Sequence, residues 1–182
     1  MAILAIRFFP DPALRKKTEA VRVFDEGLRR FVHSLHQTMV SQPHGIGIAA
    51  PQIGVSLQVF VANPSSGRGR EWVVINPVLE NATGHIGVTE GCLSIPDIWK
   101  PVRRAKRIQL RGQDITGKPL TLYAEGLLAV ILQHELDRLE GRLFIDRLSR
   151  FQRKCCNRTI NLAKRPTQSL GQRPPTLCGG RN

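Results

Sequence analysis

The 182-residue sequence lacks any long apolar run, and this absence excludes a transmembrane helix, which needs roughly 20 such residues. It also lacks paired cysteines. The four cysteines, at positions 92, 155, 156 and 178, form no CxxC pair and no disulfide-framework spacing. We therefore expect a protein of a reducing cytoplasm that makes no membrane contact. The length is sufficient for one well-filled core.

Acidic residues are scarce, with 14 Asp and Glu against 27 Lys and Arg. The segment 147–182 contains nine basic residues and no acidic one. A second basic cluster consists of Lys100, Arg103, Arg104, Lys106, Arg107 and Arg111. This distribution is typical of a surface that contacts a polyanion such as RNA, and equally of a solvated face that aids solubility.

Hydrophobic periodicity predicts two helices and several short strands. Apolar residues from Leu28 to Met39 repeat at helical spacing within 25–42, and Asp25 is a suitable N-cap. A second helix is predicted over 125–140. Runs rich in Val, Ile and Leu predict strands over 56–62, 72–79, 105–111 and 119–123. Short strands with few helices indicate an α+β fold.

The chain divides by composition into three parts. Residues 1–147 have the patterning of one folded domain. Residues 148–164 have a thin apolar stripe among basic residues, which predicts a basic helix. Residues 165–182 are rich in Pro, Gly, Gln and Thr, which predicts a disordered tail.

The predicted second helix carries a metallohydrolase-like signature that lacks one histidine. In the usual His-Glu-x-x-His pattern, two imidazoles four residues apart bind one metal ion, and the glutamate takes a proton from the bound water. His134 and Glu135 are present, but Arg138 stands at the second histidine position. An arginine stays protonated and offers no lone pair to a metal. Its side chain is long enough to reach back to Glu135 or to Cys92.

Two further motifs are ambiguous when taken alone. The segment 45–52, Gly-Ile-Gly-Ile-Ala-Ala-Pro-Gln, matches the G-x-G-x-x-A dinucleotide fingerprint, but Pro51 would disrupt the helix that should follow. It is also typical of a structural turn, or of a loop held close to a ligand by its glycines. In the segment 90–96, Cys92 taken alone is typical of a small buried core residue.

Together and in this order, the three motifs resemble the peptide deformylase family over roughly residues 3–150. The matching stretches are 47–52, 90–94 and 133–137. The resemblance implies short antiparallel strands packed around a central motif-bearing helix. It implies hydrolytic removal of the formyl group from N-formylmethionine of nascent polypeptides. The implied cofactor is one divalent metal, Fe²⁺ or else Ni²⁺, Zn²⁺ or Co²⁺, which would activate a bound water.

The resemblance also implies a role for each matching position. Cys92 and His134 correspond to metal ligands, Glu135 to the residue that transfers protons, and Arg138 to the missing third ligand. The remaining positions correspond to two oxyanion donors, the glycine beside the substrate and the methionine pocket: the Gln52 amide, the Leu93 N–H, Gly47, Ile46, Val130 and Ile131.

Three functions are therefore open. The first is a working deformylase with an altered metal site. The second is an inactive deformylase-like protein that keeps the fold and peptide or ribosome binding. The third is a generic zinc peptidase, which would leave the first two motifs without a role. The expected partners are N-formylmethionyl nascent peptides and, through the basic C-terminal segment, the ribosome and its RNA, since relatives dock there with a C-terminal helix.

Overall fold

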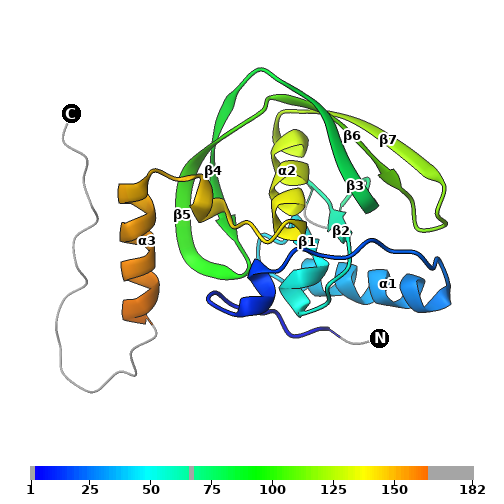
Figure 1. Ribbon diagram of the computed structural model, residues 1–182, viewed down its shortest axis with the longest axis horizontal. Helices are drawn as coiled ribbons and strands as arrows, with labels where there is room; N and C mark the ends of the chain where they lie inside the picture. Colours follow the sequence, from blue (N-terminus) through cyan, green and yellow to red (C-terminus); the bar gives the residue numbers. More distant parts are fainter. Residues whose placement is uncertain (1–2, 66–67, 164–182) are drawn as a thin grey trace.

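The computed structural model describes residues 3–65 and 68–163 of the chain (Figure 1). Three short 3-10 turns accompany the helices and strands. The elements follow in this order: η1 Pro12–Arg15, α1 Glu26–Val40, β1 Gly47–Ala49, η2 Ala50–Ile53, β2 Val59–Ala62, β3 Trp72–Thr83, β4 Ile86–Cys92, β5 Ile95–Arg104, β6 Arg107–Gln113, β7 Pro119–Glu125, α2 Leu127–Leu139, η3 Phe144–Arg147 and α3 Arg150–Ala163.

Two antiparallel sheets enclose a central helix. One sheet has five strands in the order β1-β2-β3-β6-β7, and the other is the hairpin β4-β5. The long strand β3 pairs with β2 near its start and with β6 over the rest of its length. Figure 1 shows α2 between the two sheets, with α1 below it. This arrangement confirms the predicted α+β fold.

Helix α1 forms because its apolar residues recur on one face. Leu28, Leu35 and Met39 are buried against β1 and β2. Burying such side chains contributes roughly 1.5–3 kcal/mol each. The Asp25 side chain accepts a hydrogen bond from the Leu28 N–H at 2.9 Å, so the helix begins at the predicted N-cap.

Helix α2 is buried on most of its surface, because it packs against β1, β2 and β7. A glycine follows it: Gly141 has φ 71°, and a Cβ there would lie 2.5 Å from the Arg15 carbonyl oxygen. Only glycine fits this position, and it ends the helix as predicted. The Gln133 side chain bonds both backbone groups of Ala105, at 3.0 and 2.9 Å, and ties α2 to the segment before β6.

The hairpin β4-β5 is not among the predicted strands. It contains Gly87, Gly91, Pro96 and Pro101, which lower strand propensity. Prolines are tolerated here because both strands of a two-stranded sheet have a free edge. One face of β5 is apolar and packs with η3 and α3 in a second core of Ile95, Ile98, Val102, Leu143, Phe144, Cys156 and Ile160.

Other boundaries shift slightly. The strands predicted to begin at residues 56 and 105 begin at Val59 and Arg107, and β1 is not predicted at all. The tail over 165–182 lies outside the described residues. None of the described helices is both long and apolar enough to cross a membrane.

Candidate functional site

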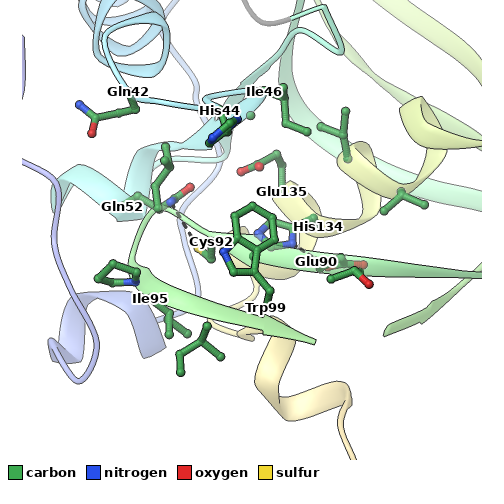
Figure 2. Close-up of a pocket in the computed structure, with 18 of the residues that line it drawn as sticks. Gln42, His44, Ile46, Gln52, Glu90, Cys92, Ile95, Trp99, His134 and Glu135 are labelled. Atoms are coloured by element: carbon green, nitrogen blue, oxygen red, sulfur yellow. Dashed lines mark hydrogen bonds and ion pairs between the residues drawn. The ribbon is translucent and has the colours of Figure 1, made fainter. Parts of the chain in front are cut away.

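A cleft of about 560 Å³ opens between β1, the hairpin β4-β5 and α2 (Figure 2). It is large enough for a short stretch of peptide or a drug-sized ligand. The three sequence motifs meet in it, although they lie about 40 residues apart along the chain. The predicted site residues that line it are Ile46, Gly47, Gln52, Cys92, Leu93, Val130, Ile131, His134 and Glu135. Arg138 does not line the cleft.

His134 is held on both ring nitrogens. Its Nδ1 lies 2.8 Å from Glu90 Oε2, and its Nε2 lies 3.1 Å from Arg138 Nη2. A guanidinium only donates, so Nε2 must offer its lone pair and the ring proton is assigned to Nδ1. Burial and Arg138 lower the pKa of His134, whereas Cys92 and Glu90 raise it to about 9. A pKa of about 9 would put a proton on both ring nitrogens at neutral pH, but two N–H donors 3.1 Å apart would repel each other. The contact with Arg138 therefore requires the neutral form of the His134 ring.

Arg138 is the largest fully buried side chain among the described residues, with 1% of its surface exposed. Besides the contact with His134, its Nη1 donates to the Arg142 carbonyl oxygen at 3.0 Å. Its Nε has no hydrogen-bond partner. The suggested pairing of Arg138 with Glu135 is not observed, since Glu135 Oε2 is also buried without a partner. The guanidinium extends toward His134 because the i,i+4 spacing places the two side chains on one face of α2.

Cys92 lies at the end of β4, within reach of two donors. Gln52 Nε2 approaches its sulfur at 3.7 Å, and the Ser94 N–H approaches it at 3.4 Å. Burial raises the pKa of the Cys92 thiol, but the positive charge of Arg138 and the interaction with His134 together lower it to about 6. The charge of Arg138 also lowers the pKa of Glu135, so it acts on both of the expected partners without forming a hydrogen bond to either.

Glu135 is almost fully buried and projects toward β1. Burial raises the pKa of its carboxyl group to about 7. A Cβ at position 47 would lie 2.4 Å from Glu135 Oε1. Gly47 is therefore required to make room for this carboxyl group, a structural role in addition to the expected place of its backbone beside a substrate.

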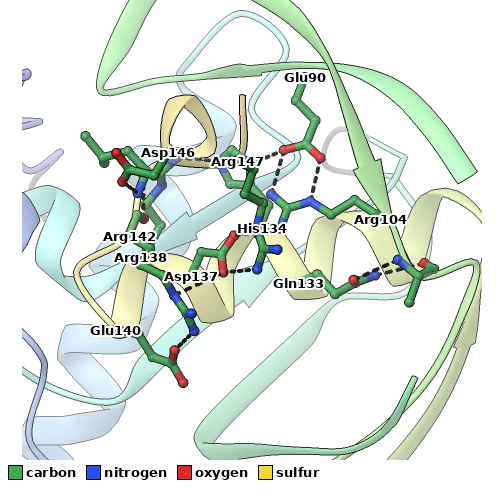
Figure 3. Close-up of polar contacts among 12 residues, drawn as sticks. Glu90, Arg104, Gln133, His134, Asp137, Arg138, Glu140, Arg142, Asp146 and Arg147 are labelled. Atoms are coloured by element: carbon green, nitrogen blue, oxygen red, sulfur yellow. Dashed lines mark hydrogen bonds and ion pairs between the residues drawn. The ribbon is translucent and has the colours of Figure 1, made fainter. Parts of the chain in front are cut away.

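A buried ion-pair network contacts His134 through Glu90 (Figure 3). Arg104 donates to both oxygens of Glu90, at 2.7 and 2.8 Å, and to Asp137 at 2.6 Å. Asp137 also accepts two hydrogen bonds from Arg147 at 2.6 Å. Burial raises the pKa of Glu90, but Arg104 and His134 lower it to about 2. The carboxylate that orients His134 is therefore ionised at neutral pH.

The sequence reasoning did not identify this network. It included Arg104 in a basic cluster, whereas the side chain is buried and ion-paired. Other members of that cluster have acidic partners as well: Arg111 pairs with Glu80, and Lys106 and Arg107 pair with Glu125. The available signal was Glu90 itself, which opens the second motif.

The described side chains offer no complete metal site. Within residues 3–65 and 68–163, no three His, Cys, Asp or Glu side chains form a group that could hold a metal ion. His44 lines the cleft but does not complete such a group with Cys92 and His134. The third position of the expected ligand set is filled by a guanidinium.

Comparison with known proteins shows the family of this chain. Residues 3–154 match the family model described as polypeptide deformylase. The peptide deformylase of Stutzerimonas stutzeri is 45% identical over 154 residues, which cover 84% of this chain and 91% of that protein. The one from Acidothermus cellulolyticus is 44% identical and covers 93% and 92%. A crystal structure of a peptide deformylase from Legionella pneumophila superposes with a TM-score of 0.84 at 38% identity, covering 91% of this chain and all of that one. The chain therefore belongs to the peptide deformylase family.

Proposed function

We propose that this protein binds N-formylmethionyl ends of nascent polypeptides in the cleft and that Arg138 suppresses the family's hydrolysis of the formyl group. One observation carries the suppression: Arg138 Nη2 lies 3.1 Å from His134 Nε2, the nitrogen that a metal would need. A less active enzyme is one reading, and a protein that only binds is the alternative.

The family uses a divalent metal, and the residues of this chain do not fit one well. Three protein ligands are usual at a catalytic metal, and the described residues supply only Cys92 and His134. The His134 lone pair is engaged by Arg138. A buried guanidinium would also repel a dication. We expect low occupancy by Fe²⁺, Ni²⁺, Zn²⁺ or Co²⁺.

We assign recognition of the formylmethionyl end to side chains and backbone groups of the cleft. We assign the methionine side chain to the apolar part of the cleft at Ile46, Val130 and Ile131. The Gln52 amide and the Leu93 N–H are the donors assigned to the formyl oxygen. The Gln52 side chain is held in place, because its Oε1 accepts a hydrogen bond from the Ala49 N–H at 2.9 Å. Its NH₂ group donates to Ser94 Oγ at 3.2 Å and approaches the Cys92 sulfur at 3.7 Å, so the amide is oriented toward the cleft.

Three residues in the cleft support residual hydrolysis of the formyl group. Glu135, Gln52 and Leu93 all line the cleft, so the family's proton-transfer and oxyanion positions are filled by the expected residue types. With its pKa raised to about 7, Glu135 can exchange a proton near neutral pH. This observation favours a slow enzyme over a binding protein.

Metal titration combined with peptide binding tests the proposal. We expect the natural protein to retain little Fe²⁺, Ni²⁺ or Zn²⁺ on elemental analysis while still binding formyl-Met-Ala-Ser. Arg138→His should bind one metal per chain. Arg138→Gln is the matched control, because it removes the charge without adding a ligand. Stoichiometric metal in the natural protein would overturn the proposed suppression.

We also propose that α3 contacts ribosomal RNA. Its basic residues are exposed, while Cys156 and Ile160 anchor the helix to the hairpin β4-β5. Contacts with phosphates release counterions, so binding should weaken steeply with salt. Neutralising Arg150, Arg153, Lys154 and Arg158 to Gln should abolish ribosome co-sedimentation at low salt. Neutralising the exposed Arg29 and Arg30 on α1 should leave it intact, and equal effects would contradict the proposal.

A further inference from the structure

Three large apolar side chains are exposed at the mouth of the cleft. Phe8 comes from the N-terminal segment, Trp99 from β5 and Leu127 from the start of α2, with 53%, 57% and 49% of their surfaces exposed. All three line the same cleft as Cys92 and Glu135. Exposed apolar side chains that gather around a cavity are typical of a binding surface. We call Phe8, Trp99 and Leu127 the apolar rim.

The position of Trp99 is set by its strand and by the residue beneath it. Its neighbour Ile98 is buried in the second core, so alternation along β5 directs Trp99 to the opposite face. A Cβ at position 91 would lie 2.8 Å from the indole. The ring therefore lies against the bare backbone of Gly91, next to Cys92, and Figure 2 shows it facing the cleft.

The direction in which a peptide binds determines which of its side chains reaches the apolar rim. This step rests on the proposed function, in which the methionine side chain enters the pocket at Ile46, Val130 and Ile131. Successive side chains of an extended peptide point in opposite directions. The side chain that follows methionine then points away from the pocket, toward the mouth and the apolar rim.

We propose that Trp99, assisted by Phe8 and Leu127, selects formylmethionyl peptides whose second residue is aromatic or large and aliphatic. An indole offers a wide, rigid surface at low conformational cost, and tryptophan is enriched among residues that dominate binding energies. Phe8 and Leu127 add exposed apolar surface to the same cleft. Trp99 is thus a specificity-determining residue outside the reacting groups.

Calorimetric binding of three peptides to the natural protein tests this selection. We expect formyl-Met-Phe-Ser to bind about tenfold more tightly than formyl-Met-Ser-Ser, which is the gain of one stacked aromatic pair. The peptide formyl-Met-Ser-Phe should bind like formyl-Met-Ser-Ser. Trp99→Ala should abolish the preference, and Trp99→Phe should restore part of it. Tyr123→Ala is the matched control, since Tyr123 is 77% exposed on β7 and does not line the cleft.

The outcomes separate this inference from the function on which it rests. If none of the three peptides binds, the proposed function and the selection both fail. If all three bind equally, formyl-peptide recognition stands and the selection by Trp99 is wrong. A preference for the third position contradicts the assigned direction of the chain. Tighter binding of every peptide by Trp99→Ala would show that the indole obstructs the cleft, which also overturns the proposal.

Discussion

Two buried arginines near His134 differ in what surrounds them. Arg104, which we call the outer arginine because it reaches His134 only through Glu90, is 2% exposed and contacts the carboxylates of Glu90 and Asp137. Arg138, which we call the inner arginine because it contacts His134 directly, is 1% exposed. It contacts a neutral ring nitrogen and a backbone carbonyl, while its Nε has no partner. The outer cation completes an ion-pair network, and the inner one hydrogen-bonds no carboxylate.

This difference separates two parts of the site. The frame is the ion-pair network of Glu90, Arg104, Asp137 and Arg147, and the centre is the group of Cys92, His134, Glu135 and Arg138. A buried charge is tolerated when opposite charges and hydrogen bonds compensate for its lost hydration, as they do for Arg104. Arg138 hydrogen-bonds only neutral groups among the described residues, and it has weaker electrostatic compensation from Cys92 and Glu135, whose pKa values its charge lowers. The frame that orients His134 is therefore fully paired, whereas Arg138 forms no hydrogen bond with a carboxylate.

The largest expected effect is on the frame. Arg104→Met leaves Glu90 and Asp137 buried with fewer positive partners, and breaking such a pair typically costs about 3–5 kcal/mol. The free energy of unfolding, measured by denaturant titration, should fall by that amount. A loss below about 1 kcal/mol would remove the distinction between the two arginines.

Strong acid should weaken the frame by protonating Asp137. Burial raises the pKa of Asp137, but Arg147 and Arg104 lower it below the ordinary value of 3.8. The stabilisation by Asp137 is therefore complete above that value and is lost as the pH falls through the folded-state pKa. Unfolding between pH 5 and pH 2.5 should show a shallower pH dependence in Asp137→Asn. Identical slopes would contradict the assignment.

The centre should be sensitive to added volume. In Gly47→Ala the new methyl group would meet Glu135 Oε1, and the shift that relieves the clash should cost about 1–3 kcal/mol. Gly87→Ala is the control, because a Cβ there meets nothing within 4 Å. Equal stability of the two variants would show that Glu135 moves freely.

The smallest effect is expected for the inner arginine itself. Arg138→Met removes a charge that has no carboxylate partner and fills a similar volume, so the free energy of unfolding should change by less than about 1 kcal/mol. The same denaturant titration checks this. A loss as large as that of Arg104→Met would show that Arg138 belongs to the frame.

The predictable part of the fold follows from local periodicity. Both α1 and α2 were predicted because apolar residues recur at helical spacing, and β2, β3, β6 and β7 because of their branched residues. The hairpin β4-β5 could not be predicted in the same way. Its glycines and prolines weaken local propensity, and its strand form depends on packing against η3 and α3.

Part of the candidate site could be predicted from the sequence, and part could not. The resemblance identified the residue types and spacing that line the cleft, from Gly47 to Glu135. The pairing of Arg104 with Glu90 and Asp137 joins three separate segments, so no local pattern could reveal it. The rim residue Trp99 was not singled out either, because exposure at a cleft is a property of the folded surface.

Parallel deformylation assays of the natural protein and Arg138→His, each supplied with the same divalent metal, test the central claim most directly. The substitution restores an i,i+4 pair of imidazoles and removes the inner cation. We expect formyl-Met-Ala-Ser hydrolysis to rise at least about a hundredfold, on the order of 3 kcal/mol in transition-state stabilisation. Equal rates in the two proteins would contradict the claim that Arg138 suppresses hydrolysis.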